Sequence, residues 1–300
     1  MAPTVIRPNF LIVGAPKCGT TAMTRYLEAH PQLFVAERKD LHCFGSDLNF
    51  TQRPSRDLAA YQAHFTDASP AQQAGEASVW YLFSTCAAAE IHAHNQEMRI
   101  IIMLRDPVDM MHALYTQLRF NGLGDEDLPS FEAALAAEPD RAAGRRLPPN
   151  TPLPEALLYR RAATYSEQVA RYQAVFPPEQ LHIILQDDLK ADTAAAYQRT
   201  LAFLGVDEGF QPDLRPVNAN KQVRSEGLRR LIGHTPGSVK SAIPDSWRRG
   251  VRKQIKRLNS RHARRPTMDP AVQQRLRQEF RPEIERLAVL IDRDLSGWLD

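Results

Sequence analysis

A glycine-containing loop near the start of the chain has the composition of an anion-binding site. Residues 11–21 read L-I-V-G-A-P-K-C-G-T-T, an apolar run followed by a loop with Gly14, Lys17 and Gly19, and then two hydroxyl residues that open a helix. Glycines let an anion approach the backbone, the N–H groups at a helix N-terminus point toward it, and lysine adds a full positive charge. The pattern predicts a phosphate- or sulfate-binding loop, and an ordinary strand-to-helix turn is the alternative.

The order of residues in this loop differs from that of loops that bind nucleoside triphosphates. A Walker A loop carries lysine after its second glycine and directly before Ser or Thr, whereas Lys17 lies two residues before Gly19. A kinase of the P-loop type also needs an acidic group to hold magnesium, and the corresponding strand end carries Arg105. Such a kinase is therefore kept only as an alternative function.

A second candidate site follows one of the most apolar runs of the chain. Residues 99–104 read R-I-I-I-M-L, and Arg105, Asp106 and Pro107 come directly after them. Asp caps helices and Pro suits a first helical turn, so the arginine is expected at the end of a strand. There its guanidinium can hold a phosphate through two hydrogen bonds. Pairing with a local carboxylate, Asp109, is the alternative.

Two further segments carry groups for proton transfer and for stacking. Residues 37–44 read E-R-K-D-L-H-C-F, in which Asp40 and His42 are candidates to take a proton from a substrate hydroxyl. In G-E-A-S-V-W-Y-L, the aromatic side chains of Trp80 and Tyr81 can stack on a sugar or an aromatic ring. Core packing is the alternative for His42 and for Trp80.

Strand and helix patterns alternate along the chain and would bring these segments together. Continuous apolar runs at residues 9–13, 99–104 and 182–185 are typical of strands buried on both faces of a parallel sheet, and 32–36 is a weaker fourth. Helical spacing follows at residues 20–29, 108–119, 159–176 and 189–204. We predict a P-loop-like three-layer α/β/α fold with a central parallel sheet. Ligands of such sheets bind at the carboxyl ends of the strands, so we expect the motifs to meet there.

Length and composition limit the class of protein. The chain has 300 residues, of which 43% are apolar and 24% charged, so a disordered, collagen-like or disulfide-framework protein is excluded. We expect one domain over residues 1–300. Three cysteines, without a C-x-x-C pair, indicate a reducing compartment. The apolar run near the N-terminus is too short for a signal sequence or a membrane span, so the expected location is cytoplasmic.

The formal charge of +3 hides an uneven distribution. Residues 221–265 contain fourteen Lys or Arg against two acidic residues, a charge of +12 that leaves −9 for the rest. Within them, residues 245–260 have the pattern of a basic amphipathic helix. Peripheral contact with an anionic membrane is one interpretation, and a solvated helix packed on the domain is another. A non-catalytic protein that binds membranes or polyanions remains an alternative function, whereas no nucleic-acid partner is expected.

Taken in order, these motifs resemble those of sulfotransferases that use 3′-phosphoadenosine 5′-phosphosulfate (PAPS), above all the bacterial and heparan-sulfate-type branch. G-A-P-K-C-G-T-T is similar to the family's 5′-phosphosulfate loop, and K-D-L-H-C-F to its K-E-x-H-F-F pattern. G-E-A-S-V-W-Y-L and N-A-N-K-Q-V-R-S resemble further family segments. The resemblance implies transfer of a sulfuryl group from PAPS, without a metal, to a hydroxyl of a carbohydrate or a small-molecule metabolite. It implies nothing about the oligomeric state.

The resemblance also implies roles for individual residues. The 5′-phosphate and the sulfuryl group would be held by Lys17, Cys18, Gly19, Thr20 and Thr21, and the catalytic base would be Asp40, with His42 as the second candidate. Aspartate is one methylene shorter than the glutamate usual in the family, so its reach depends on the position of its loop.

The 3′-phosphate site departs from the family pattern. Arg105 would bind this phosphate together with a serine eight residues on, and that position is Ala113 in this chain. We expect His112 or a basic residue of the C-terminal segment to replace the missing hydroxyl, with Lys221 and Arg224 as candidates. Glu76 and Trp80 would line the acceptor cleft, as their segment does in the family.

Overall fold

The computed structural model describes residues 7–52, 54–121, 125–149, 151–215, 221–223, 260–262 and 267–300. Within these residues a five-stranded parallel sheet has the order β2-β3-β1-β4-β5. Its strands are β1 (Phe10–Gly14), β2 (Leu33–Val35), β3 (Gln73–Ala77), β4 (Arg99–Leu104) and β5 (Leu181–Leu185). The predicted α/β class with a central parallel sheet is confirmed.

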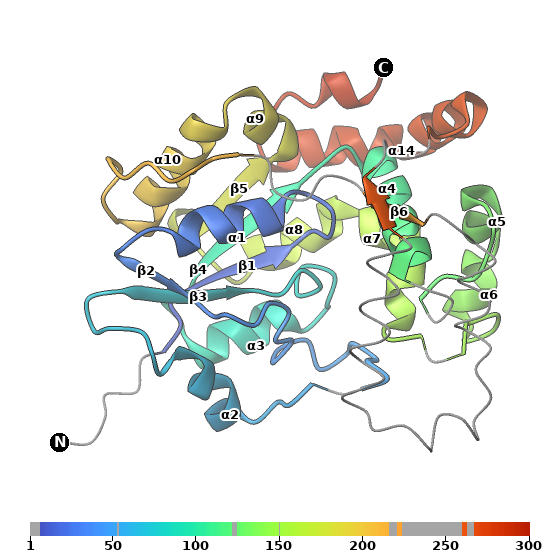
Figure 1. Cartoon of the computed structure of the whole chain (residues 1–300). Coiled ribbons are helices and arrows are strands. Elements are labelled where there is room, and N and C mark those ends of the chain that lie inside the picture. The colour runs from blue at the N-terminus through green and yellow to red at the C-terminus, as the bar shows by residue number, and fades with distance from the viewer. Residues whose placement is uncertain are drawn as a thin grey trace.

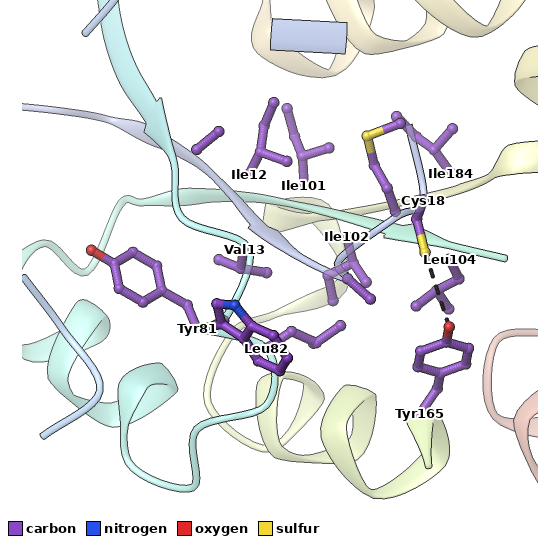
Figure 2. Close-up of a cluster of buried hydrophobic side chains, with 14 of the residues drawn as sticks. Ile12, Val13, Cys18, Tyr81, Leu82, Ile101, Ile102, Leu104, Tyr165 and Ile184 are labelled. Atoms are coloured by element: carbon purple, nitrogen blue, oxygen red, sulfur yellow. Dashed lines mark hydrogen bonds between the residues drawn. The ribbon is translucent and has the colours of Figure 1, made fainter. Parts of the chain in front are cut away.

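Helices cover both faces of this sheet (Figure 1). One layer contains α1 (Thr20–Glu28), α9 (Gln186–Ala191) and α10 (Thr193–Leu204), and the other contains α3 (Ala87–His94) and α8 (Tyr165–Gln173). The central strands β1 and β4 are apolar along nearly their whole length because both of their faces are buried. Figure 2 shows this core, with Ile12 and Val13 of β1 beside Ile101 and Ile102 of β4.

The strand β3 is the element of the sheet that the sequence did not predict. Its sequence, Q-A-G-E-A, has no β-branched or aromatic residue, so it lacks the usual strand signal. A Cβ atom at Gly75 would lie 2.5 Å from Phe10 of the neighbouring strand, so the close contact between β1 and β3 requires glycine there. The four strands that the sequence did predict are all present, within one or two residues of their expected bounds.

Two predicted helices are each split into two. The pattern at residues 159–176 forms α7 (Tyr159–Ala163) and α8, which are separated at Thr164. The pattern at residues 189–204 forms α9 and α10, because the Asp192 side chain accepts a hydrogen bond from Ala195 N and caps a new helix. The short elements α2 (Leu58–Gln62), η1 (Ala63–Phe65) and η3 (Pro178–Gln180) lie in connections.

A long connection after α4 (Pro107–Asn121) carries three short helices, α5 (Phe131–Ala136), α6 (Glu138–Ala142) and η2 (Pro154–Leu157). A buried ion pair anchors it: both Nη atoms of Arg141 donate to Glu126 at 2.7 Å, and Tyr159 Oη donates to the same carboxylate at 2.6 Å. The connection is therefore held against α7, so its residues keep fixed positions relative to that helix.

The C-terminal part contains α14 (Pro270–Leu290) and η4 (Ser296–Trp298), and α14 packs on α8 and α4. Two short strands, β6 (Lys221–Val223) and β7 (Ser260–His262), pair antiparallel, and β6 lies against α4 (Figure 1). The rest of the predicted basic segment, including nearly all of the amphipathic helix at 245–260, lies outside the described residues. Among the helices that are described, none is long and apolar enough to cross a bilayer.

Candidate active site

The carboxyl ends of the strands open into a cavity of about 700 Å³. Loop residues after β1, the first residues of α1, Arg105 after β4 and Gln186 after β5 all line it. Asp40, His42, α4 and the connection after α4 line the same cavity. The structure thus brings together the anion-binding loop, the arginine and the proton-transfer candidates that the sequence predicted separately.

Glycine is required at two positions of the loop after β1. Gly14 has φ of +148°, and a Cβ atom there would lie 2.7 Å from the carbonyl oxygen of Val79. Gly19 has φ of +94° and stands directly before the first turn of α1. This left-handed conformation favours glycine and presents the free N–H groups of the α1 N-terminus to the cavity.

Lys17 places a cation in the same loop. Its own φ is +65°, a conformation that is uncommon for a residue with a side chain. Lys17 Nζ donates to Gln117 Oε1 of α4 at 3.2 Å, and the Gln186 amide donates to the Lys17 carbonyl at 3.3 Å. The loop is therefore held between α4 and the end of β5, with its ammonium group at the cavity.

Lys39 is a second cation at this site, and the sequence analysis missed it. Its ammonium donates to the hydroxyls of Thr20 at 3.1 Å and Thr21 at 2.9 Å, which belong to the first turn of α1. Burial lowers its pKa, while Asp40 and Glu76 act in the opposite direction. Its position directly before Asp40 in E-R-K-D was the available signal, but only the tertiary structure shows that it reaches the anion-binding loop.

Asp40 and His42 both line the cavity, and both have left-handed backbones, with φ of +60° and +51°. Non-glycine residues adopt this conformation at a cost, and they persist in it where surrounding contacts enforce it. Asp40 N donates to Ala77 O at 2.9 Å, and Val79 N donates to Asp40 Oδ1 at 3.3 Å. The last residue of β3 thus fixes the backbone of Asp40, and the chain directly after β3 fixes its carboxylate.

The environment of His42 favours its neutral form. Its ring lies 4.4 Å from the ring of Phe50 and 6.1 Å from that of Tyr81, between centroids. Burial lowers the pKa of His42 to about 4, with Asp40 acting in the opposite direction. Its Nδ1 is buried and has no hydrogen-bond partner. At neutral pH the ring is uncharged, and protonation would place a cation beside these aromatic rings.

Glu76 does not line the cavity, contrary to our expectation that it contacts the acceptor. It is 1% exposed, and burial raises the pKa of its carboxyl to about 8. The Ser78 hydroxyl donates to Glu76 Oε2 at 2.8 Å and accepts from His42 N at 3.1 Å. Because side chains alternate along a strand, Glu76 points into the interior and contacts the site through Ser78.

Arg105 lines the cavity next to a local carboxylate. Its Nη2 lies 2.5 Å from Asp109 Oδ2, so the alternative pairing considered from the sequence is present in this structure. The Arg105 side chain is 11% exposed and that of Asp109 is 44% exposed. Arg105 Nε is buried without a partner. The guanidinium therefore retains an unsatisfied donor, and its carboxylate partner is the more exposed of the two.

The remaining candidates are placed as follows. Trp80 lines the cavity and is 9% exposed, whereas Cys18 and Ala113 do not line it. The Cys18 thiol lies 3.9 Å from the Tyr165 hydroxyl in the core (Figure 2), and its burial raises its pKa to about 12, so the thiol does not face a ligand in the cavity.

The residues predicted to replace the missing serine either do not line the cavity or have side chains that the structure does not describe. The His112 ring packs against the ring of Phe131, 5.3 Å between centroids, and does not line the cavity. Lys221 begins β6, whose backbone lies against α4, and Arg224 lies outside the described residues. Among the side chains that are described, no group of three His, Cys, Asp or Glu has the arrangement of a metal site.

The residues present fit an anionic donor. Lys17, Lys39 and Arg105 supply positive charge at the strand ends, and the first turn of α1 supplies N–H and hydroxyl donors. A carboxylate, Asp40, lies at the same cavity. Fold and site together define a P-loop-like α/β protein whose cationic loop shares a cavity with a carboxylate.

The model of one protein family, the sulfotransferase domain, matches residues 7–288. The chain therefore belongs to the sulfotransferase family. Membership and fold together indicate a PAPS-dependent transferase that moves a sulfuryl group to a hydroxyl acceptor.

Individual relatives agree with this assignment. A solved sulfotransferase from Alicyclobacillus acidocaldarius is 30% identical, covers 99% of this chain and 100% of its own, and superposes with a TM-score of 0.74. Heparan sulfate glucosamine 3-O-sulfotransferase 6 of Mus musculus is 25% identical over 80% of this chain and 66% of its own length. The Homo sapiens enzyme of the same name is 25% identical over 85% and 70%. The chain thus spans about two thirds of the length of these curated relatives.

Proposed function

We propose that Asp40 is the general base, and that Lys39 together with the loop that contains Lys17 binds the phosphosulfate of PAPS. The supporting observation is that this carboxylate and both ammonium groups line one cavity. Asp40 would take the proton of the acceptor hydroxyl as its oxygen attacks the sulfur. The bond between sulfur and the 5′-phosphate oxygen breaks, and 3′-phosphoadenosine 5′-phosphate (PAP) leaves with the bond's electron pair. Lys17 and the N–H groups of the loop stabilise the charge on that leaving oxygen.

Asp40 is favoured over His42 because of their surroundings. A base gains a proton in the transition state, and the imidazolium formed from His42 would lie beside Phe50 and Tyr81 in a site where burial already disfavours charge. Transfer of the proton to the Asp40 carboxylate forms no such cation. We therefore assign His42 a contact with the acceptor and not the abstraction of the proton.

Arg105 is proposed to bind the 3′-phosphate after release from Asp109. A phosphate offers a guanidinium two hydrogen bonds and more charge than a carboxylate. Because Arg105 Nε has no hydrogen-bond partner, a phosphate that accepts from it displaces no existing bond. Lys221 and Arg224 remain proposed contacts of the same phosphate, since β6 lies against α4. Replacement of Asp109 by Asn should strengthen PAP binding several-fold in titration calorimetry. Weaker binding in D109N would contradict this exchange of partners.

The proposed roles are tested with the variants Lys17→Ala and Asp40→Asn. With labelled PAPS and a pool of hydroxyl acceptors, each should lower turnover by about 10²-fold or more. The control is Leu58→Ala, because Leu58 is 46% exposed on α2, away from the cavity. Near-normal turnover in either variant, with thermal unfolding unchanged, would reject the role of that residue.

The reaction is proposed to need no metal, so EDTA should leave turnover unchanged.

The two alternative functions are separated by binding measurements. Titration with PAPS against ATP and Mg²⁺ distinguishes a sulfotransferase from a kinase. Strong binding to anionic liposomes without release of PAP from PAPS would favour a membrane-binding protein. We also propose that residues 245–260 make peripheral contact with a membrane and that residues 1–300 form one domain.

A further inference from the structure

Helix α9 contacts the loop between β1 and α1 at two points. The Gln186 amide donates to the Lys17 carbonyl at 3.3 Å. A Cβ atom at Gly19 would lie 3.1 Å from Leu189 Cδ2, so the buried Leu189 side chain packs closely against the loop. The left-handed backbone of Lys17 persists only where surrounding contacts enforce it. The position of α9 therefore helps to set the conformation of this loop.

This helix is too short to hold its own position. It has six residues, Gln186–Ala191, and isolated helices of fewer than about 12 residues are marginal in water. Its place depends on its neighbours, since it follows β5 directly and packs on α10. A third neighbour is the segment after α14, residues 291–300, which lies beside α9 in Figure 1. This segment contacts the first turn of the helix.

Two side chains of residues 291–300 donate to the acidic first turn of α9. Trp298 Nε1 donates to Asp187 Oδ2 at 2.8 Å, and Arg293 Nη2 donates to both carboxylate oxygens of Asp188, at 2.8 and 3.0 Å. Trp298 is buried, and its indole has a single polar hydrogen to satisfy. The ring and the Asp187 carboxylate therefore orient each other. Direct contacts thus connect Trp298 to α9, and α9 to the loop.

We propose that Trp298 is a positioning residue for the binding of PAPS and acts through Asp187 and α9 on the loop with Lys17. The inference rests on the proposed function, in which this loop binds the phosphosulfate. Trp298 does not line the cavity, so its effect on the donor is indirect. Without its hydrogen bond, α9 can shift, and Gln186 and Leu189 shift with it. The N–H groups of the loop would then be less well aligned with the anion, which weakens its binding.

The variant Trp298→Phe tests this role because it keeps an apolar ring and removes the N–H. Calorimetric titration of the full chain with PAP should give a Kd about fivefold higher, or more, than that of wild type. With labelled PAPS and a pool of hydroxyl acceptors, KM for PAPS should rise similarly. The value of kcat should stay within about twofold, since Asp40 is held by contacts at the end of β3 instead.

The matched control is Tyr197→Phe in α10, the helix next to α9. Tyr197 is buried, and its hydroxyl has no hydrogen-bond partner among the described residues, so its removal breaks no bond. This variant should leave the Kd for PAP unchanged. An unchanged Kd in Trp298→Phe as well, even with a lower unfolding temperature, would show a purely structural role and overturn the inference.

Asp187→Ala tests whether Trp298 acts through this carboxylate. Asp187 interacts electrostatically with Arg105, so loss of its charge alone would tighten the binding of an anion, whereas loss of a positioning contact weakens it. We expect weaker PAP binding in Asp187→Ala and no further loss in the double variant with Trp298→Phe. Tighter or unchanged binding in Asp187→Ala, or additive losses, would overturn the inference. If the wild-type chain did not bind PAP, the proposed function would fail as well.

Discussion

The Ser78 hydroxyl donates to Glu76 Oε2 at 2.8 Å and at the same time accepts from the backbone N–H of His42 at 3.1 Å. A fully buried carboxyl group therefore orients the hydroxyl that fixes the left-handed segment containing the proposed base. Neither residue lines the cavity, so we expect both to act by positioning the segment with Asp40 and His42.

Ser78→Ala should lower kcat about tenfold with KM for PAPS nearly unchanged, because the loop with Asp40 loses one of its anchors while the phosphosulfate loop keeps its contacts. Steady-state kinetics at several PAPS concentrations measure this split. Ser78→Thr retains the hydroxyl and should restore most of the rate. An equal loss in both variants would argue against a positioning hydrogen bond.

Glu76 should make stability depend on pH. Burial raises its pKa from 4.5 to about 8, so the folded protein binds this proton more tightly than the unfolded chain does. The stabilisation is complete below about pH 4.5 and is lost as the pH rises toward 8. Glu76→Gln removes this titration, so its free energy of unfolding relative to wild type should increase by about 2–5 kcal/mol across that range. Urea titrations at pH 5 and pH 8.5 test this, and a constant difference would contradict it.

Lys39→Met should weaken PAPS binding and lower turnover, each by about tenfold or more, because Thr20 and Thr21 lose their ammonium partner and the transferring group loses a positive charge. Fluorescence or calorimetric titration gives the affinity. Lys190→Met is the matched control, since Lys190 is 59% exposed and pairs with Asp187 at 3.0 Å. Equal effects in the two variants would indicate general electrostatics rather than a specific contact.

Arg141→Ala should lower the free energy of unfolding by about 3–5 kcal/mol, because it leaves the Glu126 carboxylate buried without its cation. KM for the acceptor should rise as well, since Asp125, next to Glu126, lines the cavity. Arg145→Ala removes an exposed pair with Asp140 and should leave the unfolding midpoint unchanged. Denaturant titration of both variants checks the contrast, which would vanish if the connection were held by other contacts.

Much of the fold could be predicted from local signals. Continuous apolar runs gave β1, β4 and β5, because strands buried on both faces cannot alternate with polar residues. The strand β3 could not be found in this way, since its Gly75 serves a close contact with Phe10 that belongs to another part of the chain. The breaks at Thr164 and Asp192 were missed because the residues around them still have helical spacing. At Asp192 a side-chain cap starts the second helix, and at Thr164 the backbone leaves helical angles, with φ of −80° and ψ of 78°.

Local sequence patterns alone predict an anion-binding loop, a strand-end arginine and the order of motifs typical of a PAPS-dependent sulfotransferase, because each depends on residues adjacent in the chain. The tertiary structure decided what depends on contacts between distant segments. In this structure Lys39 donates to Thr20 and Thr21, and Arg105 pairs with Asp109. The side chains of Glu76 and Cys18 are buried and do not line the cavity. The tertiary structure also gathered the cavity lining from the loop after β1, the segment with Asp40, α4 and the connection after α4. Burial and charge at a site are set by the neighbours of each side chain in space, and a linear pattern does not contain them.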